Sequence, residues 1–300
     1  MAMATSFGTR SEKIVYNIAS FGQIVLTSRR VRIQTTDYIQ GEAFQTEKRT
    51  VFGRGWMPLC AAGQIAKPGD FLAQAVGGWS MLGVRDTDGA VRVLRNACRH
   101  QNMPVAGQPS GHCESFRCRF HGWTYDLQGR FLSAPPAVAP ADTSPGATDL
   151  LSLPVRQMAD LVFFTVEEVS SGFFPPDPGQ PYSGTIVTDI ACNWKVCLEH
   201  LLGSQGTSEP EFAWFWPVLV VRRSGSVVLV EQVVPHTFLR TKLFTHVFGG
   251  AVEAQKFSAA MTKEACERQQ VERANGTPAQ GSALVAQFHR QLDEAYSGSS

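Results

Sequence analysis

Between Cys98 and Tyr125 the chain has the sequence CRHQNMPVAGQPSGHCESFRCRFHGWTY. This stretch contains two short pairs, Cys98-x-His100 and Cys118-x-x-His121, with seventeen residues between them. Each pair offers one thiolate and one imidazole to a metal centre. Two cysteines on one iron and two histidines on the other hold a [2Fe–2S] cluster whose reduction potential is raised by the neutral imidazoles. The pattern therefore predicts such a cluster, with the ligands Cys98, His100, Cys118 and His121.

Three other structures use the same residue types. Zinc sites also bind two cysteines and two histidines, but zinc fingers usually group the two cysteines in one loop, whereas each loop here carries one of each. Any one of the four side chains, taken alone, is more often a buried structural residue. A disulfide framework is disfavoured because the seven cysteines occur in a chain whose first residues show no secretory signal. The sequence Gly122-Trp123-x-Tyr125 favours the cluster, since glycine lets the backbone pass close to it.

On these residues the chain resembles the Rieske domain of the α subunits of Rieske non-haem iron oxygenases, also called ring-hydroxylating oxygenases. The family pattern is C-x-H-R-G followed by C-x-x-H-G-W-x-Y. This chain keeps both ligand pairs and the final motif, but has Gln101-Asn102 where the family often has Arg-Gly. Respiratory Rieske proteins carry an extra cysteine in each cluster loop, where this chain has Met103 and Phe120. The resemblance thus implies an oxygenase-type cluster of lower potential, and it continues more weakly over most of the chain.

Composition narrows the possible partners. The 300 residues, 43% of them hydrophobic, suit two modest domains or one large one. Lys and Arg exceed Asp and Glu by one (27 − 26) without a basic block, so nucleic acid is not an expected partner. No apolar run approaches eighteen residues, and residues 1–10 have no apolar signal segment. We therefore expect a cytoplasmic protein that does not bind a membrane.

The order of strand, turn and helix signals predicts an α+β protein. The predicted divisions are an N-terminal segment (1–47) that packs on the C-terminal domain, an antiparallel β Rieske domain (48–168), a linker (169–184) and a shortened, helix-grip-like domain of antiparallel sheet with helices (185–300). In that last domain we predict a helix over 190–202, strands over 214–222, 226–234 and 237–248, and helices over 254–274 and 281–296.

The resemblance also implies a second metal centre, which this chain does not preserve. In the family, a helix that follows Asn-Trp-Lys carries a bridging acid, then Tyr-His, then a second His. These two histidines and a distant carboxylate hold a mononuclear iron with open positions for O₂. Here Asn193-Trp194-Lys195 and Glu199 are present, but Gly203 stands at the bridging acid and Gln205-Gly206 at Tyr-His. Met261-Thr262 stands where the distant carboxylate belongs. We therefore expect no mononuclear Fe(II) and no catalytic residue.

Five other residues could replace the lost iron ligands, namely His200, Glu209, Glu211, His236 and His246. His200 follows Glu199 directly, and adjacent side chains on a helix do not share a face. We expect His236 and His246 to be packed or surface histidines, and the two glutamates beside Pro210 to be solvated in a loop. A rebuilt iron site is the weaker alternative.

The sequence thus favours a Rieske electron-transfer or auxiliary subunit of a heteromeric oxygenase. The expected partners are a full-length α-type subunit, in a trimer or stacked hexamer, and a reductase or ferredoxin as electron donor. The resemblance implies that His121 is the electron exit, while Arg99 and Arg119 either dock an acidic donor or are ordinary surface charges. Two alternatives stay open: a complete mono- or dioxygenase with non-standard iron ligands, and a stand-alone Rieske redox or binding protein.

Overall fold

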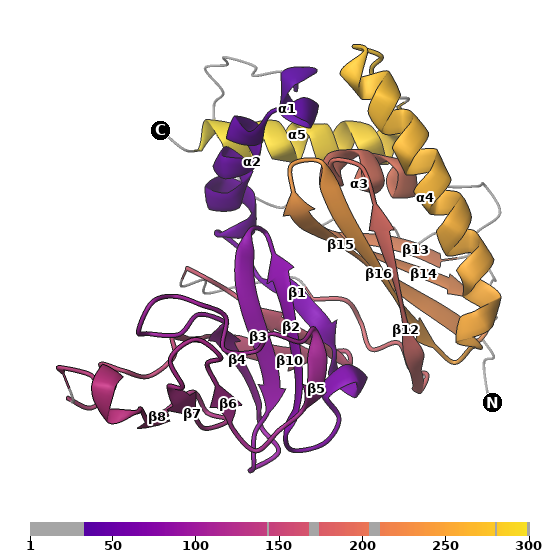
Figure 1. Ribbon diagram of the computed structural model, residues 1–300. Coiled ribbons are helices and arrows are strands. Elements are labelled where there is room, and N and C mark those ends of the chain that lie inside the picture. Colours follow the sequence, from indigo (N-terminus) through magenta and orange to yellow (C-terminus); the bar gives the residue numbers. More distant parts are fainter. Residues whose placement is uncertain (1–32, 143, 168–173, 204–210, 280, 299–300) are drawn as a thin grey trace, which may run out of the picture.

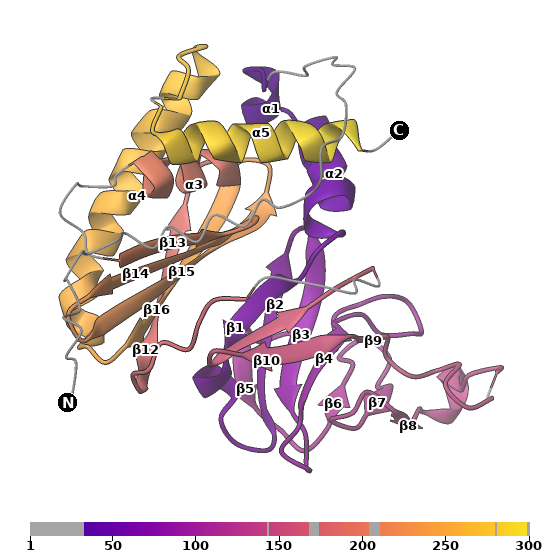
Figure 2. The same ribbon diagram turned by 180° about the vertical axis from the view of Figure 1, so that it is seen from behind.

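The computed structural model describes residues 33–142, 144–167, 174–203, 211–279 and 281–298. These residues form two lobes, which lie side by side (Figures 1 and 2). The first lobe consists of short antiparallel strands, and the second is one larger antiparallel sheet with helices against it. The predicted α+β class with antiparallel sheets is therefore confirmed.

Three antiparallel sheets make up the first lobe. One has the order β1-β11-β10, formed by β1 (Met57–Ala61), β11 (Leu161–Phe164) and β10 (Val155–Met158). The next has the order β5-β2-β3-β4-β9, formed by β5 (Ser110–His112), β2 (Asp70–Val76), β3 (Trp79–Arg85), β4 (Val91–Arg95) and β9 (Ser152–Leu153). The smallest has the order β6-β7-β8, formed by β6 (Phe116–Arg117), β7 (Thr124–Tyr125) and β8 (Phe131–Ser133). Two single helical turns belong to this lobe, η2 (Ala62–Ile65) and η3 (Pro136–Val138).

The hairpin of β3 and β4 turns at Asp88-Gly89, as the sequence predicts. Gly89 has a φ of 79°, a conformation that glycine adopts without steric cost. The buried carboxylate of Asp86 accepts the backbone N–H groups of Asp88 at 2.9 Å and Ala90 at 3.1 Å. This turn directs β4 towards the first ligand pair, which follows it in the chain.

The second lobe is built on one five-stranded antiparallel sheet of order β12-β16-β15-β14-β13. Its strands are β12 (Tyr182–Ile190), β13 (Glu211–Phe215), β14 (Leu219–Ser224), β15 (Val227–Thr237) and β16 (Arg240–Phe248). Its helices are α3 (Trp194–Gly203), α4 (Val252–Ala274) and α5 (Ala283–Ser297). The three predicted helices and the strands over 226–234 and 237–248 are confirmed within a few residues. Within the described part of the chain, no helix is both long and apolar enough to cross a membrane.

Two segments of the second lobe differ from the prediction. The single strand predicted over 214–222 is wrong, because β13 ends at Phe215 and β14 begins only at Leu219. The turn lies in the apolar sequence Trp216-Pro217-Val218, where only the proline signals a break. The predicted linker, 169–184, lies partly outside the described residues, and its last residues belong to β12.

Short helices at the start of the described chain pack against the second lobe. They are α1 (Thr36–Ile39), α2 (Gly41–Glu47) and the helical turn η1 (Lys48–Phe52). The buried carboxylate of Glu47 binds three groups of the second lobe: Lys195 Nζ at 2.5 Å, Trp194 Nε1 at 2.6 Å and Tyr296 Oη at 2.6 Å. A buried charge is tolerated only with such partners, so this carboxylate ties α2 to α3 and α5.

Glu199 makes a second buried polar cluster in the same region. It accepts hydrogen bonds from Tyr38 Oη at 2.5 Å and Arg273 Nε at 3.0 Å, and its Oε1 lies 2.8 Å from His289 Nε2. These partners belong to α1, α4 and α5. The glutamate of the Asn-Trp-Lys helix therefore joins four helices in the interior.

Candidate metal centre

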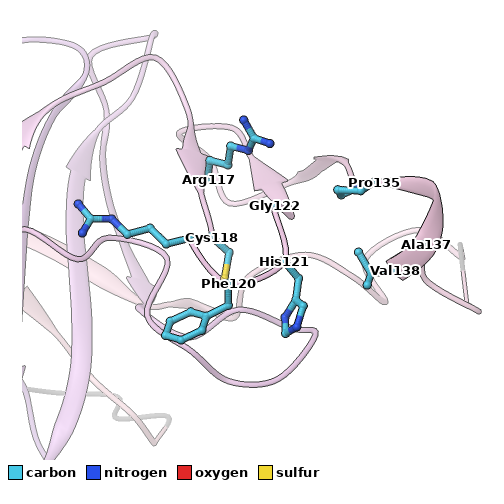
Figure 3. A pocket seen from close by; sticks show the side chains of 9 residues that line it. Arg117, Cys118, Phe120, His121, Gly122, Pro135, Ala137 and Val138 are labelled. Carbon is cyan, nitrogen blue, oxygen red and sulfur yellow. The ribbon is translucent and has the colours of Figure 1, made fainter.

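The second predicted ligand pair, Cys118-x-x-His121, lies at the end of the first lobe formed by β6, β7 and β8 (Figures 1 and 3). Cys98-x-His100 follows β4, and Cys118-x-x-His121 lies between β6 and β7. Both thiols are buried, and they belong to the same apolar cluster. The imidazole rings of His100 and His121 have centroids 4.6 Å apart and planes at 83°. The structure thus places the two thiols in one apolar cluster and the two imidazoles in contact with each other.

The first loop is closed by backbone hydrogen bonds and a buried asparagine. Cys98 N donates to Met103 O, and Asn102 N donates to Cys98 O, each at 2.7 Å. Asn96 Oδ1 accepts the N–H groups of Val105 at 3.0 Å and Ala106 at 2.9 Å, and its Nδ2 donates to Ala106 O. The sequence prediction missed this role of Asn96, whose only signal was its position two residues before the first ligand.

Asn102 explains how the first loop departs from the family pattern. Its φ is 58°, in the left-handed region where the family often has glycine. Among the other residues, asparagine enters this region most readily, because its short side chain bonds locally. The substitution therefore preserves the turn.

The second loop repeats this construction. Cys118 N donates to Trp123 O at 2.8 Å, and Gly122 N donates to Cys118 O at 2.9 Å. Gly122 has a φ of 76°, and a Cβ there would lie 3.2 Å from Pro135 Cγ and 3.4 Å from Arg117 Nη2. Both the conformation and the close approach favour glycine at this position.

Aromatic side chains surround the ligands from inside the lobe. The Trp123 ring stacks on His100 at 5.2 Å, and its Nε1 donates to Val138 O at 2.8 Å. The Tyr125 hydroxyl lies 3.2 Å from Cys98 Sγ and accepts the N–H of Arg99 at 3.1 Å. Burial, and then the contact with Cys98, raise the pKa of Tyr125, so this hydroxyl keeps its proton.

One nitrogen of the site has no partner among the described residues. His100 Nδ1 is buried and makes no hydrogen bond. A buried polar atom without a partner costs about 1–3 kcal/mol, so native structures rarely contain one. A bond to iron would satisfy this nitrogen. The thiols of Cys98 and Cys118, buried together in one apolar cluster, would supply the sulfur ligands. The residues present therefore fit a [2Fe–2S] cluster.

The side of His121 faces the surface. Its imidazole borders an open hollow of about 570 Å³ whose lining includes Arg117, Phe120, Pro135 and Val138 (Figure 3). Phe120 is 57% exposed although it lies between the two ligands of its loop. Arg99, Arg117 and Arg119 are exposed as well. The surface around the hollow therefore combines the exposed phenyl ring of Phe120 with positively charged side chains.

The described positions at which the resemblance implies a second metal centre, Gly203 and Met261-Thr262, lie on α3 and α4. Gly203 is the last residue of α3 and is exposed, while Gln205-Gly206 lies outside the described residues. Thr262 is buried in α4, and Met261 is 46% exposed. Where the family has carboxylates, this chain therefore has a glycine without a side chain, the hydroxyl of Thr262 and the thioether of Met261.

The possible replacement ligands are dispersed. His246 uses both ring nitrogens, because Nδ1 lies 2.8 Å from Thr185 Oγ1 and Nε2 lies 3.3 Å from Gln232 Oε1. His236 is exposed at the end of β15, and His200 lies on α3, where burial lowers its pKa. Glu209 lies outside the described residues, and of Glu211 only the backbone, in β13, is described.

Comparisons with known proteins agree with this geometry. Residues 55–154 match the family described as the Rieske [2Fe–2S] domain. Over 113 residues the chain is 35% identical to the chlorobenzene dioxygenase subunit alpha of Cupriavidus sp. (strain PS12), which covers 38% of this chain and 25% of that subunit. Over 111 residues it is 33% identical to the biphenyl 2,3-dioxygenase subunit alpha of Rhodococcus jostii (strain RHA1), covering 37% and 24%. The matched part thus spans about a quarter of each relative.

The likeness in fold extends over more of the chain. The quaternary ammonium Rieske monooxygenase CntA in complex with L-carnitine superimposes with a TM-score of 0.70 at 16% identity, over 88% of this chain and 95% of that one. Naphthalene 1,2-dioxygenase from Rhodococcus sp. gives 0.60 at 14% identity, over 88% and 84%. The first lobe therefore contains a Rieske [2Fe–2S] domain that is homologous to that of ring-hydroxylating dioxygenase α subunits, and the second lobe shares the fold of these oxygenases.

Proposed function

We propose that this chain is an electron-transfer or auxiliary subunit of a heteromeric Rieske oxygenase, without a mononuclear iron of its own. The proposed ligands of its [2Fe–2S] cluster are Cys98, His100, Cys118 and His121. The observation that carries the proposal is the buried, unpartnered Nδ1 of His100 beside two buried thiols. The cluster supplies a one-electron carrier when bound. The chain's own residues hold the ligands in place and exclude water from the inner side.

The two proposed histidine ligands have different roles in this proposal. His100 is packed between the Trp123 ring and the His121 ring, which supports a position on the inner side. His121 borders the open hollow, which supports its assignment as the electron exit. The exposed Arg99 and Arg119 support docking of an acidic electron donor near this rim, because opposite charges speed diffusional encounter.

Two observations support the proposed lack of a mononuclear iron. Gly203 has no donor atom, and Thr262 is a poor iron ligand. Both nitrogens of His246 already have hydrogen-bonding partners.

The proposed partner is a subunit that supplies the oxygen-activating iron that this chain is proposed to lack. Its curated relatives are α subunits of dioxygenases. A chain that carries electrons but does not activate oxygen needs a neighbour that does. We propose a full-length α-type subunit as this neighbour, in a trimer or stacked hexamer, and a ferredoxin or reductase as the donor.

Counting iron and acid-labile sulfide per chain tests the proposal. The chain is purified anaerobically, and its reduced state is examined by EPR. Two irons and two sulfides with a Rieske-type signal are expected, together with no O₂ consumption until an α-type subunit is added. A third iron with substrate-dependent O₂ consumption by the chain alone would instead establish a complete oxygenase. Full redox function in cells without any oxygenase partner would establish a stand-alone protein.

Exchange of one proposed ligand tests the cluster assignment. His121→Cys is expected to retain a cluster of lower potential, because an anionic thiolate stabilises the oxidised iron more than imidazole does. The potential is measured by redox titration of the visible circular dichroism. His112→Cys, in which an exposed histidine of β5 is replaced, serves as the control and keeps the wild-type potential. An unchanged potential in His121→Cys would remove this residue from the ligand set.

A further inference from the structure

Exposed apolar side chains follow one face of α4. Phe257 is 77% exposed, Val271 61% and Met261 46%. At 3.6 residues per turn, these three positions lie within about 40° of a common line along the helix. We call this line the α4 stripe. Large apolar side chains gathered on one exposed face mark an interaction site.

The opposite face of α4 packs against the second lobe. Thr262, Cys266 and Gln270 are buried on the opposite face. In Figures 1 and 2 the helix lies along the flank of the second lobe, against β12 and near α3, and no other described element covers its outer side. The α4 stripe therefore contributes nothing to the packing of the described fold.

Two opposite charges lie within the stripe. Glu264 and Arg268 are both exposed, and they lie within about 20° of the same line. Both lie between Met261 and Val271 in the sequence. The outer face of α4 is thus ordered apolar, acidic, basic, apolar. This order is self-complementary when a second helix with the same sequence runs in the opposite direction.

We propose that the α4 stripe binds a second copy of this chain, with the two α4 helices antiparallel about a two-fold axis at the level of Cys266. In this register Met261 faces the second copy's Val271, and Glu264 faces its Arg268. Because the contact is isologous, each of these pairs forms twice. Phe257 then covers the end of the second copy's helix near Asn275.

The charges select this register over its neighbour. Moving the axis to the level of Glu264 would set Phe257 against the second copy's Val271. It would also bring the two Glu264 carboxylates face to face, and like charges in an interface cost several kcal/mol. The proposal rests on α4 alone and is independent of how the cluster functions.

The mass of the full chain in solution tests the contact. Light scattering during gel filtration is expected to give an even number of chains, and half that mass for Met261→Glu. Leu151→Glu is the control, because Leu151 is an apolar side chain of the first lobe that is at least as exposed as Met261, at 55%. Its mass is expected to stay unchanged. Circular dichroism shows that each variant is folded. A wild-type monomer or odd-numbered assembly, or an unchanged mass of Met261→Glu, would overturn the proposal.

Charge reversal tests whether Glu264 pairs with Arg268 of the second copy. Glu264→Arg alone places two positive charges together at two positions, and is expected to raise the dissociation constant at least about tenfold. Arg268→Glu alone places two negative charges together at the same two positions and is expected to raise the dissociation constant to a similar extent. The double variant Glu264→Arg, Arg268→Glu is expected to restore the assembly. Failure of the double variant to recover would contradict the Glu264–Arg268 pairing.

Cross-linking tests the register. Equal amounts of Met261→Cys and Val271→Cys protein are mixed and oxidised with diamide, and a disulfide-linked dimer is expected only in the mixture. Each variant alone places its new cysteines ten residues apart along antiparallel helices, about 15 Å, which exceeds the Cα separation of about 4.4–6.8 Å that a disulfide spans. The wild type treated in the same way controls for the native cysteines. Efficient cross-linking of either variant alone would contradict the register.

Discussion

The Tyr125 hydroxyl lies between the backbone of one ligand loop and a proposed ligand sulfur. It accepts the Arg99 N–H at 3.1 Å, so its own proton is free to point at Cys98 Sγ, 3.2 Å away. A donor to this sulfur stabilises the reduced state of a cluster, which carries more negative charge. Tyr125→Phe is therefore expected to lower the reduction potential by roughly 40–90 mV, the equivalent of about 1–2 kcal/mol for one electron.

Redox titration followed by EPR measures this shift. Tyr182→Phe, which removes a tyrosine hydroxyl in β12 of the second lobe, is the matched control and keeps the wild-type potential. An equal potential in Tyr125→Phe and wild type would mean that the hydroxyl does not bond to the sulfur.

His246 makes stability depend on pH. Burial lowers its pKa to about 3, whereas an unfolded histidine titrates near 6.5. Below about pH 6.5 the unfolded state therefore binds a proton that the folded state does not, and the free energy of unfolding falls as the pH is lowered towards 3. Between pH 7.5 and 5.5 this single group is expected to lower the free energy of unfolding by about 1.4 kcal/mol. Denaturant unfolding of wild type and His246→Asn at the two pH values measures it. Parallel losses of stability in both proteins would contradict the assignment.

Local spacing explains why the sequence predicted the ligand pairs and not their surroundings. Cys98 and His100 are two residues apart, so their partnership is visible in the sequence. Tyr125 reaches Cys98 across 27 residues, and Tyr38 reaches Glu199 across 161. Such contacts depend on how the elements pack, which no local pattern specifies. His289, which contacts Glu199, was likewise not predicted as a functional or structural partner.

At the scale of elements, one buried ion pair connects α2, α3 and α5. Lys195 and Glu47 are both fully buried, and the carboxylate also accepts from Trp194 and Tyr296. Lys195→Met leaves the charge of Glu47 without a counter-charge, and is expected to reduce the free energy of unfolding by about 3–5 kcal/mol. The double variant Lys195→Met, Glu47→Gln retains a neutral acceptor at this place and is expected to lose less than Lys195→Met alone.

Denaturant unfolding of the wild type, both single variants and the double variant measures this coupling. Additive losses would mean that the two charges do not depend on each other. The result also tests how the N-terminal helices are held, because Glu47 supplies the contact from their side.

Periodicity predicted the long helices but not every strand end. The segment that became α5 alternates apolar and polar residues at helical spacing, and its predicted bounds differ from the structure by two residues or fewer. In contrast, Trp216, Pro217 and Val218 form a turn inside an apolar run. Burial of that run against the helices outweighs the usual polar composition of turns, so hydrophobicity alone did not indicate the break.

At the scale of the whole molecule, the two lobes share one buried core. Leu59 and Phe164 of the first lobe belong to the same apolar cluster as Val233 and Leu243 of the second. A buried hydrogen bond joins them as well, because Gln232 Nε2 on β15 donates to the Pro58 carbonyl of β1 at 2.6 Å. A continuous core favours cooperative unfolding over independent melting of the lobes.

This continuity predicts coincident transitions in denaturant. Visible circular dichroism follows the cluster in the first lobe, and far-ultraviolet circular dichroism at the helix band is dominated by α3, α4 and α5 of the second lobe. We expect both signals to be lost at the same guanidinium concentration.

A variant of the connecting hydrogen bond tests the same continuity. Gln232→Leu leaves the Pro58 carbonyl without its donor and is expected to reduce the free energy of unfolding by about 1–3 kcal/mol. Both signals are then expected to shift to the same lower midpoint. Separate midpoints, or a shift of only one signal, would mean that the lobes fold as independent domains. The cluster would then report on its own lobe alone, and a change in the second lobe would leave its midpoint unaltered.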